Sequence, residues 1–174
     1  MRIFILLICV LTISSCAQKE EEVIGETKDW SMDHSVDFNQ ELHQREELAI
    51  KIYLAHHEDL KMISTGSGLR YQLAKDRVGK GEKARVGDHL SLDMKIELMD
   101  GRLCYKTDSI PEKFILGMSN DESGLHEVLQ LMKSNEKAKL IVPSYLAHGL
   151  LGDSEQIPPQ SILLIDVELL SINQ

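Results

Sequence analysis

The feature that most constrains the fold of this sequence is a regular alternation of apolar and polar residues over residues 90–98. Leucine, methionine or isoleucine stands at every second position, and the positions between carry serine, aspartate, lysine and glutamate. Because successive side chains of a β-strand point to opposite faces of a sheet, this pattern predicts a strand with one face in a hydrophobic core and the other in water. The Asp100-Gly101 pair that follows is typical of a tight turn into a second strand.

Further strands are predicted at residues 69–74, 102–106, 113–116, 136–142 and 161–172, and residues 78–81 are expected to form a turn. One short helix is expected among them, just after Gly124. Its apolar residues recur at the helical period: Leu125, Val128, Leu129 and Met132. The sequence therefore indicates the α+β class, with an antiparallel β-sheet wrapped around one short α-helix.

A helix is also predicted ahead of the sheet, at residues 37–65, with Gly66 and Gly68 ending it. It carries an apolar stripe that must be buried, either against the following domain or against a second copy of the chain. The second arrangement would give a homodimer through residues 37–61. His56 and His57 are expected at the surface. Adjacent histidines on a helix point in different directions, so we do not expect them to bind one metal ion together. The stripe consists of Leu42, Leu48, Ala49, Ile52, Tyr53 and Leu60.

The N-terminus has the organisation of a targeting segment. Arg2 precedes an almost unbroken apolar run at residues 3–13, and two serines then lead to Cys16. The run is too short to cross a membrane as a mature helix. Its end resembles the lipobox of bacterial lipoproteins, which implies that residues 1–15 are a signal peptide and that Cys16 carries acyl chains. The alternative is an ordinary secretory signal with an incidental cysteine.

Residues 16–36 are polar and acidic without periodicity, and we expect a disordered tether there. Lys19 and the glutamates after it resemble the surface-export signal of Bacteroidetes lipoproteins, although a solvated spacer explains them equally well. The expected location is the bacterial cell envelope, with the lipid anchor in the outer membrane and the membrane face left open. The formal net charge of -9 excludes nucleic acid as a partner, because phosphate binding requires a basic face.

The turns and strands of residues 66–174 carry short motifs in a particular order. Together they resemble the FKBP-type peptidyl-prolyl cis-trans isomerase family, over the region from about Gly68 to the C-terminus. The leader, tether and preceding helix also resemble the isomerase-like lipoproteins of Bacteroidetes, some of which are associated with gliding motility. The motifs are Gly79-Lys80-Gly81, Val86-Gly87-Asp88, Asp100-Gly101, Phe114-Ile115-Leu116-Gly117, Gly124-Leu125, Leu131-Met132-Lys133, Ala138-Lys139-Leu140, Pro143 to Gly149, Ile157-Pro158-Pro159 and Asp166 to Leu170.

The resemblance implies an FKBP-like sheet with a pocket that holds a proline ring. In that family the pocket is lined by aromatic and branched apolar residues, together with an aspartate. The corresponding positions here are Met94, Cys104, Tyr105, Leu125, His148, Ile157 and Ile165.

Most of these positions depart from the family's lining. Met94 and Leu125 stand where the family has tyrosine and tryptophan, and the aspartate is missing near Tyr105. Asp121-Glu122 replace an apolar pair, and His148 replaces a tyrosine. Because carboxylates hold water where a proline ring should be dry, we expect weak isomerase activity or none. Two functions follow: a membrane-anchored isomerase-like lipoprotein that assists the folding or assembly of envelope proteins, acting on proline-containing polypeptides, or a non-catalytic peptide-binding or assembly module.

Other chemistries find little support in the sequence. Residues 79–81 lack the spacing of a phosphate-binding loop. Ser144 and His148 lack the strand-turn-helix context of a hydrolase. The carboxylates of Asp121-Glu122 are expected in a solvated loop, and Cys104 is expected to be a small buried hydrophobic residue. We expect no cofactor and no metal ion.

Overall fold

The computed structural model describes residues 32–76, 78–119 and 122–173. The predicted signal peptide and Cys16 lie outside these residues, as does most of the predicted tether. The chain divides into two compact units, Met1–Val36 and Asp37–Gln174. The fold and the candidate site described below belong to the second unit. No helix in the described ranges is long and apolar enough to span a membrane.

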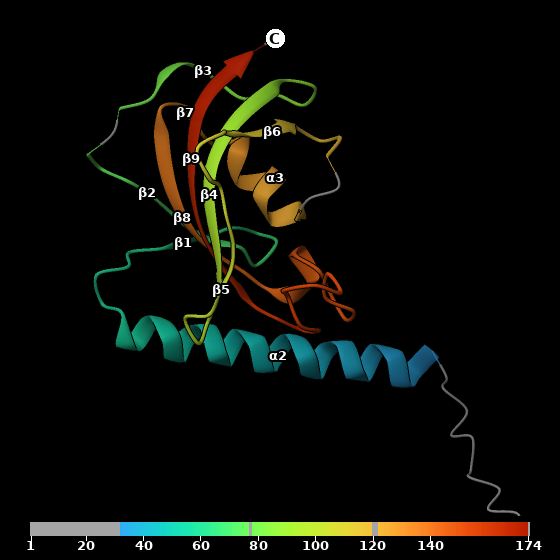
Figure 1. The fold of residues 1–174 in the computed structure, drawn as a ribbon. Coiled ribbons are helices and arrows are strands. Elements are labelled where there is room, and N and C mark those ends of the chain that lie inside the picture. The colour runs from blue at the N-terminus through green and yellow to red at the C-terminus, as the bar shows by residue number, and fades with distance from the viewer. Residues whose placement is uncertain (1–31, 77, 120–121, 174) are drawn as a thin grey trace, which may run out of the picture. The chain divides into compact units, whose positions relative to one another are not determined.

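The described residues of the second unit form a seven-stranded antiparallel sheet in the order β1-β2-β8-β9-β4-β5, in which β6 also pairs with β4 (Figure 1). The long alternating strand is β4 (His89–Leu98), and it pairs along its whole length with β9 (Leu163–Asn173). The antiparallel sheet and the α+β class are therefore confirmed. The other strands are β1 (Ile63–Ser64), β2 (Arg70–Leu73), β5 (Leu103–Lys106), β6 (Glu112–Ile115) and β8 (Glu136–Val142).

A second, two-stranded sheet joins β3 (Lys80–Lys83) to β7 (Lys133–Ser134). The sequence predicted only a turn at residues 78–81, and that prediction was wrong. All four residues of β3 are exposed, and its pairing with β7 is irregular. A strand that buries no side chain has no apolar alternation from which it could be recognised.

The hydrophobic core lies between the sheet and α3 (Ser123–Leu129). Gly124 allows the two to approach closely, because a Cβ atom at this position would lie 2.7 Å from Val142 Cγ1. Burying a leucine fully contributes roughly 1.5–3 kcal/mol, so this helix face stabilises the whole domain. The four apolar residues predicted on one face of the helix segment are all fully buried: Leu125, Val128, Leu129 and Met132.

The N-terminal helix, α2, runs from Met32 to His56, whereas the sequence predicted residues 37–65. It begins earlier because residues 32–36 contain no glycine or proline, and the last five residues of the predicted tether are therefore helical. It ends earlier because the side chains of His56 and His57 reach back, each placing Nδ1 2.8 Å from the carbonyl oxygen four residues before it. The chain then turns into β1.

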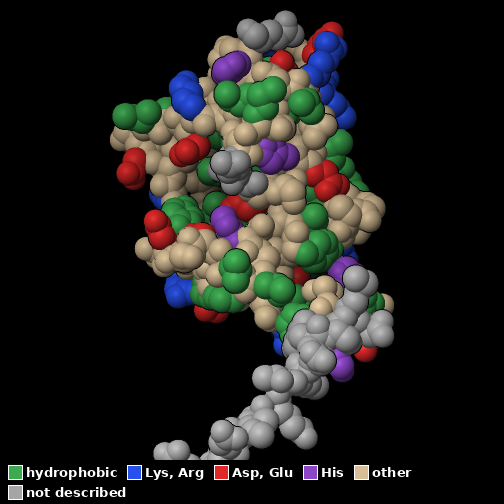
Figure 2. Space-filling model, turned by 90° about the vertical axis from the view of Figure 1, so that its right-hand side faces the viewer, with side chains coloured by type: hydrophobic (Ala, Val, Ile, Leu, Met, Phe, Trp, Pro, Cys, Tyr) green, Lys and Arg blue, Asp and Glu red, His purple; other side chains and the backbone are tan. Residues whose placement is uncertain are grey.

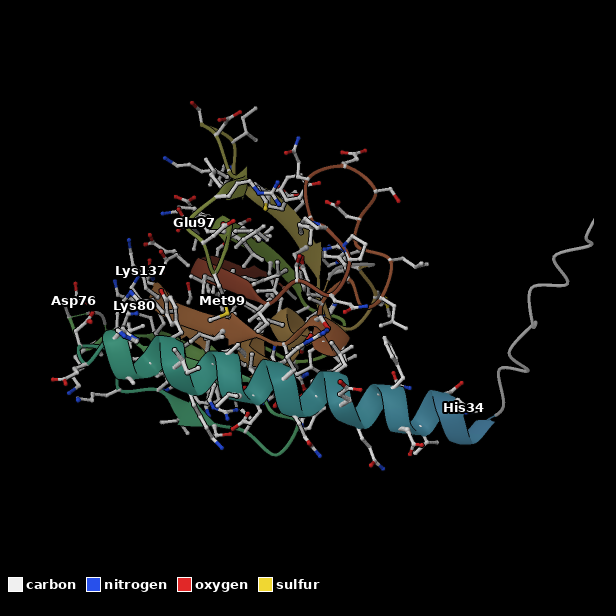
Figure 3. The ribbon with its side chains drawn as sticks, turned by 90° about the horizontal axis from the view of Figure 1, so that it is seen from below. His34, Asp76, Lys80, Glu97, Met99 and Lys137 are labelled. Atoms are coloured by element: carbon white, nitrogen blue, oxygen red, sulfur yellow. The ribbon has the colours of Figure 1, made fainter. Side chains whose placement is uncertain are left out.

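From Asp37 onward, α2 crosses one end of the sheet, beneath the ends of the strands (Figures 1 and 3). Leu42 and Ile50 are buried in this contact. Leu48 and Ile52, on the same predicted stripe, stay 59% and 52% exposed. The stripe is therefore only partly covered by the domain. His56 is exposed as expected, but His57 is half-buried, because its ring stacks on Tyr53 at a centroid distance of 3.9 Å.

Candidate functional site

The residues predicted to form the pocket come from four elements and one loop. Met94 lies on β4, Cys104 and Tyr105 on β5, Leu125 on α3, and Ile165 on β9. Leu125 and Ile165 belong to the buried core, as does Ile157 in the loop before β9. Met94, Cys104 and Tyr105 are half-buried and pack against that core. The fold thus connects six of the seven predicted residues through one hydrophobic cluster.

The seventh residue, His148, is tied to the start of α3 by a carboxylate. Its Nε2 lies 2.9 Å from Glu122 Oε1, and the Glu122 side chain is only 5% exposed. The carbonyl of Glu122 also accepts the N–H groups of Leu125 and His126, so the helix start fixes its backbone. The expectation of a solvated loop was therefore wrong for Glu122, because His148 supplies a partner that allows its burial. Asp121 lies outside the described residues.

A second polar pair, Tyr105 and Asp153, links β5 to the loop before β9. The Tyr105 hydroxyl donates a hydrogen bond to Asp153 Oδ2. Asp153 Oδ1 accepts the backbone N–H groups of Glu155, Gln156 and Ile157 at 2.8, 2.9 and 2.8 Å. The Asp153 carboxylate thereby orders the turn that places Ile157 in the core, and it bonds that turn to β5. Figure 2 shows the side of the molecule that carries α3 and this loop, where acidic and histidine side chains are mixed with hydrophobic ones.

The electrostatics of this pair follow from its hydrogen bonds. Burial alone would raise the pKa of the Asp153 carboxyl, but the Tyr105 hydroxyl and the backbone N–H groups outweigh it and lower the pKa to about 2. The same hydrogen bond, with burial adding to it, raises the pKa of Tyr105 to about 12. At neutral pH the site therefore holds a carboxylate and a neutral phenol.

Cys104 is half-buried rather than buried as expected, and its thiol is not activated as a nucleophile. Burial raises the pKa of its thiol, and the carboxylates of Asp153 and Asp100 raise it further against the opposing effect of Arg102. Its Sγ lies 3.6 Å from the carbonyl oxygen of Gln156, which suits a neutral thiol that donates weakly.

Ser144 and His148 do not form a nucleophile and base. Ser144 begins the short helix η1 (Ser144–Leu146) and is 1% exposed, and its Oγ has no hydrogen-bond partner among the described residues. The ring of His148 bonds Glu122 instead. The described residues also contain no group of three histidine, cysteine, aspartate or glutamate side chains placed to hold a metal ion.

One residue of this site, Asp153, was missed from the sequence, and the burial of another, Glu122, was not foreseen. Asp153 follows Gly152 and precedes a serine, a composition typical of a turn in which an aspartate accepts nearby backbone N–H groups, so a local signal existed. Glu122 carried no such signal for burial. Its partner His148 is 26 residues away, and only the folded chain brings the two together.

A hollow of about 380 Å³ lies on the face of the sheet opposite α3, across β2, β8, β9 and β4, and of the predicted residues only Met94 contributes to it. Its lysines are engaged in ion pairs, Lys139 with Asp166 at 2.6 Å and Lys137 with Glu168 at 2.7 Å. It is therefore separate from the site built by Tyr105, Leu125 and His148.

Comparison with curated proteins finds related isomerases. FkpA of Escherichia coli K12, an FKBP-type peptidyl-prolyl cis-trans isomerase, is 34% identical over 113 residues, which cover 64% of this chain and 41% of FkpA. A probable FKBP-type isomerase of Haemophilus influenzae is 29% identical over 110 residues, covering 63% of this chain and 45% of that protein. The chain thus spans less than half the length of these relatives.

Solved structures agree with the sequence comparison. The crystal structure of Escherichia coli FkpA matches with a TM-score of 0.65 and 28% identity, covering 80% of this chain and 64% of that one. An isomerase from Pseudomonas syringae matches with a TM-score of 0.63 at 23% identity, covering 75% and 96%, which shows the shared fold. The sequence model for FKBP-type peptidyl-prolyl cis-trans isomerases matches residues 80–170. The chain therefore belongs to the FKBP-type peptidyl-prolyl cis-trans isomerase family.

Proposed function

We propose that this protein binds proline-containing segments of other polypeptides at the site between β5, α3 and the loop before β9, and that it turns their prolyl bonds slowly or not at all. Membership of the isomerase family supports the choice of ligand. The observation that carries the proposed loss of rate is the His148–Glu122 pair, a buried carboxylate at 2.9 Å from an imidazole within the site.

The physical reason lies in what catalysis of this reaction requires. Rotation about a prolyl amide faces a barrier of about 18–20 kcal/mol, because the amide loses its resonance in the twisted state. An apolar pocket favours that state, since the twisted amide is less polar than the planar one. Glu122, at a position that is apolar in the family, and His148, at the position of a tyrosine, form a polar pair that favours water and the planar amide.

The second candidate is a binding or assembly module that holds a peptide without isomerising it. The same pair favours this function, and the apolar side chains exposed nearby offer contact area for a polypeptide. Exposed large hydrophobic residues on the strand and loop beside the site are Leu103, Leu150 and Leu151. The two candidates differ only in whether slow turnover remains, so one experiment separates them.

We further propose that the protein acts at the bacterial cell envelope, anchored to the outer membrane through lipid on Cys16, and assists the folding or assembly of envelope proteins. The lipobox-like leader and the acidic segment after it support this placement. Their similarity to lipoproteins of Bacteroidetes, including those associated with gliding motility, supports the finer assignment. The exposed Leu48 and Ile52 on α2 support a homodimer through this helix.

The test measures binding and turnover on the same sample of the full chain. Isothermal titration calorimetry with a short peptide containing a Leu-Pro bond should show binding, while the rate of isomerisation of that peptide should stay close to its rate in buffer. A rate far above that in buffer, lost in a folded Leu125→Ala variant, would contradict the proposed loss of catalysis. Absence of binding would contradict the proposed ligand.

A further inference from the structure

Three consecutive residues of α2 contact the domain at separate points. Arg45 Nη2 donates to Gln160 Oε1 at 2.7 Å, Glu46 Oε2 accepts the backbone N–H of Ser144 at 3.1 Å, and Glu47 forms a two-pronged pair with Arg70. Of the three, only Glu46 is buried, with 4% of its surface exposed. The contact of Glu46 is therefore shielded from water, where a hydrogen bond to a charged group is strong.

The partner of Glu46 is the first residue of η1, and η1 leads directly to His148. The carbonyl of Ser144 accepts the N–H groups of Ala147 and Gly149, the two neighbours of His148, at 3.0 and 2.8 Å. The carbonyl of Leu146 accepts the hydroxyl of Ser123, the residue after Glu122, at 3.1 Å. One short turn thus holds the backbone beside both members of the His148–Glu122 pair.

The far end of the same loop is held by α2 as well. Gln160, which receives Arg45, donates its backbone N–H to the carbonyl of Gly149 at 2.9 Å. His43 contributes a ring contact with Tyr145 at a centroid distance of 5.3 Å. The helix therefore contacts residues 144–160 at both ends of the segment that carries His148, Asp153 and Ile157.

A buried carboxylate is an unusual choice for a contact that serves only to fix a helix. Glu46 Oε1 and Ser144 Oγ, both buried, have no hydrogen-bond partner among the described residues, so this interface leaves polar groups unsatisfied. An apolar side chain would dock the helix at less desolvation cost. The Glu46 carboxylate adds a specific hydrogen bond to the backbone N–H of Ser144, the first residue of η1.

We propose that Glu46 is a positioning residue for the candidate site: by accepting the Ser144 N–H it sets the turn that places His148 against Glu122. Docking of α2 and occupation of the site are then thermodynamically coupled, and each strengthens the other. This inference rests on the proposed function for its ligand, a proline-containing peptide, but the placement of His148 can be measured without any ligand.

The test compares the full chain with four single variants at the contact and its control. Glu46→Ala removes the acceptor, whereas Glu46→Gln keeps an acceptor oxygen and should restore the contact. Glu47→Ala, the matched control, removes a neighbouring carboxylate whose partner is Arg70 on β2. Ser144→Pro removes the donor instead. Proline is acceptable at the first position of η1, because Pro143 before it already has the extended conformation, with φ -58° and ψ 154°, that a following proline requires.

The first readout is the imidazole NMR signal of His148, identified by its absence in a His148→Gln variant. It should move in Glu46→Ala and remain in place in Glu46→Gln and Glu47→Ala. Peptide affinity by calorimetry should fall about tenfold in Glu46→Ala only. In the Ser144→Pro background, Glu46→Ala should cause no further movement, because the bond is already absent.

An unmoved His148 signal in Glu46→Ala would overturn the proposal, as would an equal movement in Glu47→Ala. If Glu46→Ala fails to fold, Ser144→Pro decides alone, and an unmoved His148 signal in that variant is equally contradictory. If the wild-type chain does not bind the peptide, the proposed function fails, yet the His148 signal still reports whether Glu46 positions the turn.

Discussion

Asp153 shows how one side chain can organise a functional loop. Its carboxylate accepts three backbone N–H groups and the Tyr105 hydroxyl, so the loop before β9 is held by hydrogen bonds to a charge. Gly152 before it must be glycine, because its φ is +70° and a Cβ atom would lie 2.2 Å from the Ile157 carbonyl oxygen. The position of Ile157 in the core therefore depends on the Asp153 carboxylate and on the backbone conformation of Gly152.

Asp153→Asn is expected to lower the free energy of unfolding at pH 7 by about 1–2 kcal/mol, because a neutral amide accepts weaker hydrogen bonds. The folded pKa of Asp153, about 2, lies below its usual value of 3.8, so this stabilisation is present above pH 4 and is lost as the pH falls towards 2. The difference between wild type and variant, measured by urea unfolding, should therefore shrink from pH 5 to pH 2.

Glu155→Gln is the control for this experiment, since Glu155 is exposed in the same loop and only its backbone bonds Asp153. It should change neither the stability at pH 7 nor its acid dependence. A wild type and an Asp153→Asn variant that lose stability in parallel between pH 5 and pH 2 would contradict the role given to this carboxylate.

At the scale of single residues, the sequence predicted which side chains the fold brings together better than it predicted their hydrogen bonds. The motif order indicated Tyr105, Leu125, Ile157 and Ile165, and the fold connects them through one core. The burial of Glu122 was not predictable, because a carboxylate in a polar stretch is normally solvated and its partner is distant in sequence. Hydrogen bonds between distant loops depend on the whole fold rather than on local pattern.

At the scale of elements, predictability followed hydrophobic periodicity. β4, β9 and α3 alternate or repeat with the period of their structure. The bounds of β4 and β9 were predicted to within two residues, whereas the predicted helix face reached Met132, three residues beyond the end of α3. β3 and β7 were missed because neither carries an apolar alternation, and the bounds of α2 were shifted because no glycine or proline marks either end of the helix in the sequence. The sequence predicted the apolar stripe of α2. It did not predict that Leu42 would be buried against the domain while Leu48 and Ile52 stay exposed.

The exposed part of that stripe tests the proposed homodimer. Leu48 and Ile52 are one helical turn apart, so they present adjacent apolar side chains to a second copy. Sedimentation velocity of the full chain should show a dimer, and the double variant Leu48→Glu and Ile52→Glu should sediment as a monomer.

Lys51→Glu provides the control, because it places a carboxylate on the same turn at a position that is already exposed and charged. It should leave the dimer intact. A wild-type chain that sediments as a monomer at micromolar concentration, or a double variant that stays dimeric, would exclude α2 as the interface.

At the scale of the whole molecule, the chain combines a family fold with a proposed lipid anchor. The isomerase-type domain occupies the region that the family's sequence model matches, residues 80–170, and α2 precedes it with contacts to the loop that carries His148. If Cys16 is acylated, the domain works at a membrane surface, where its clients would be other envelope proteins. Neither the anchor nor the clients could be argued from the fold, because the fold is shared by proteins in many settings.

Cys16→Ala is expected to abolish incorporation of labelled palmitate and to move the protein from the membrane fraction to the soluble fraction of the producing cells, because stable anchoring requires acyl chains. Cys104→Ala is the matched control, since Cys104 packs against the core and should not be acylated. Labelling that persists in Cys16→Ala, or that is lost in Cys104→Ala, would contradict lipid attachment at Cys16.

Whether the Glu122–His148 pair limits turnover can be measured as the catalysed rate of prolyl isomerisation after the pair is made apolar and aromatic. The double variant Glu122→Ile and His148→Tyr should raise kcat/KM for a Leu-Pro peptide by about tenfold over wild type, a gain of about 1.4 kcal/mol in transition-state stabilisation. Glu127→Ile, which removes a carboxylate that bonds Ser67 instead, should have no such effect. A folded double variant no faster than wild type, or a wild type already far faster than buffer, would contradict the claim that this pair limits turnover.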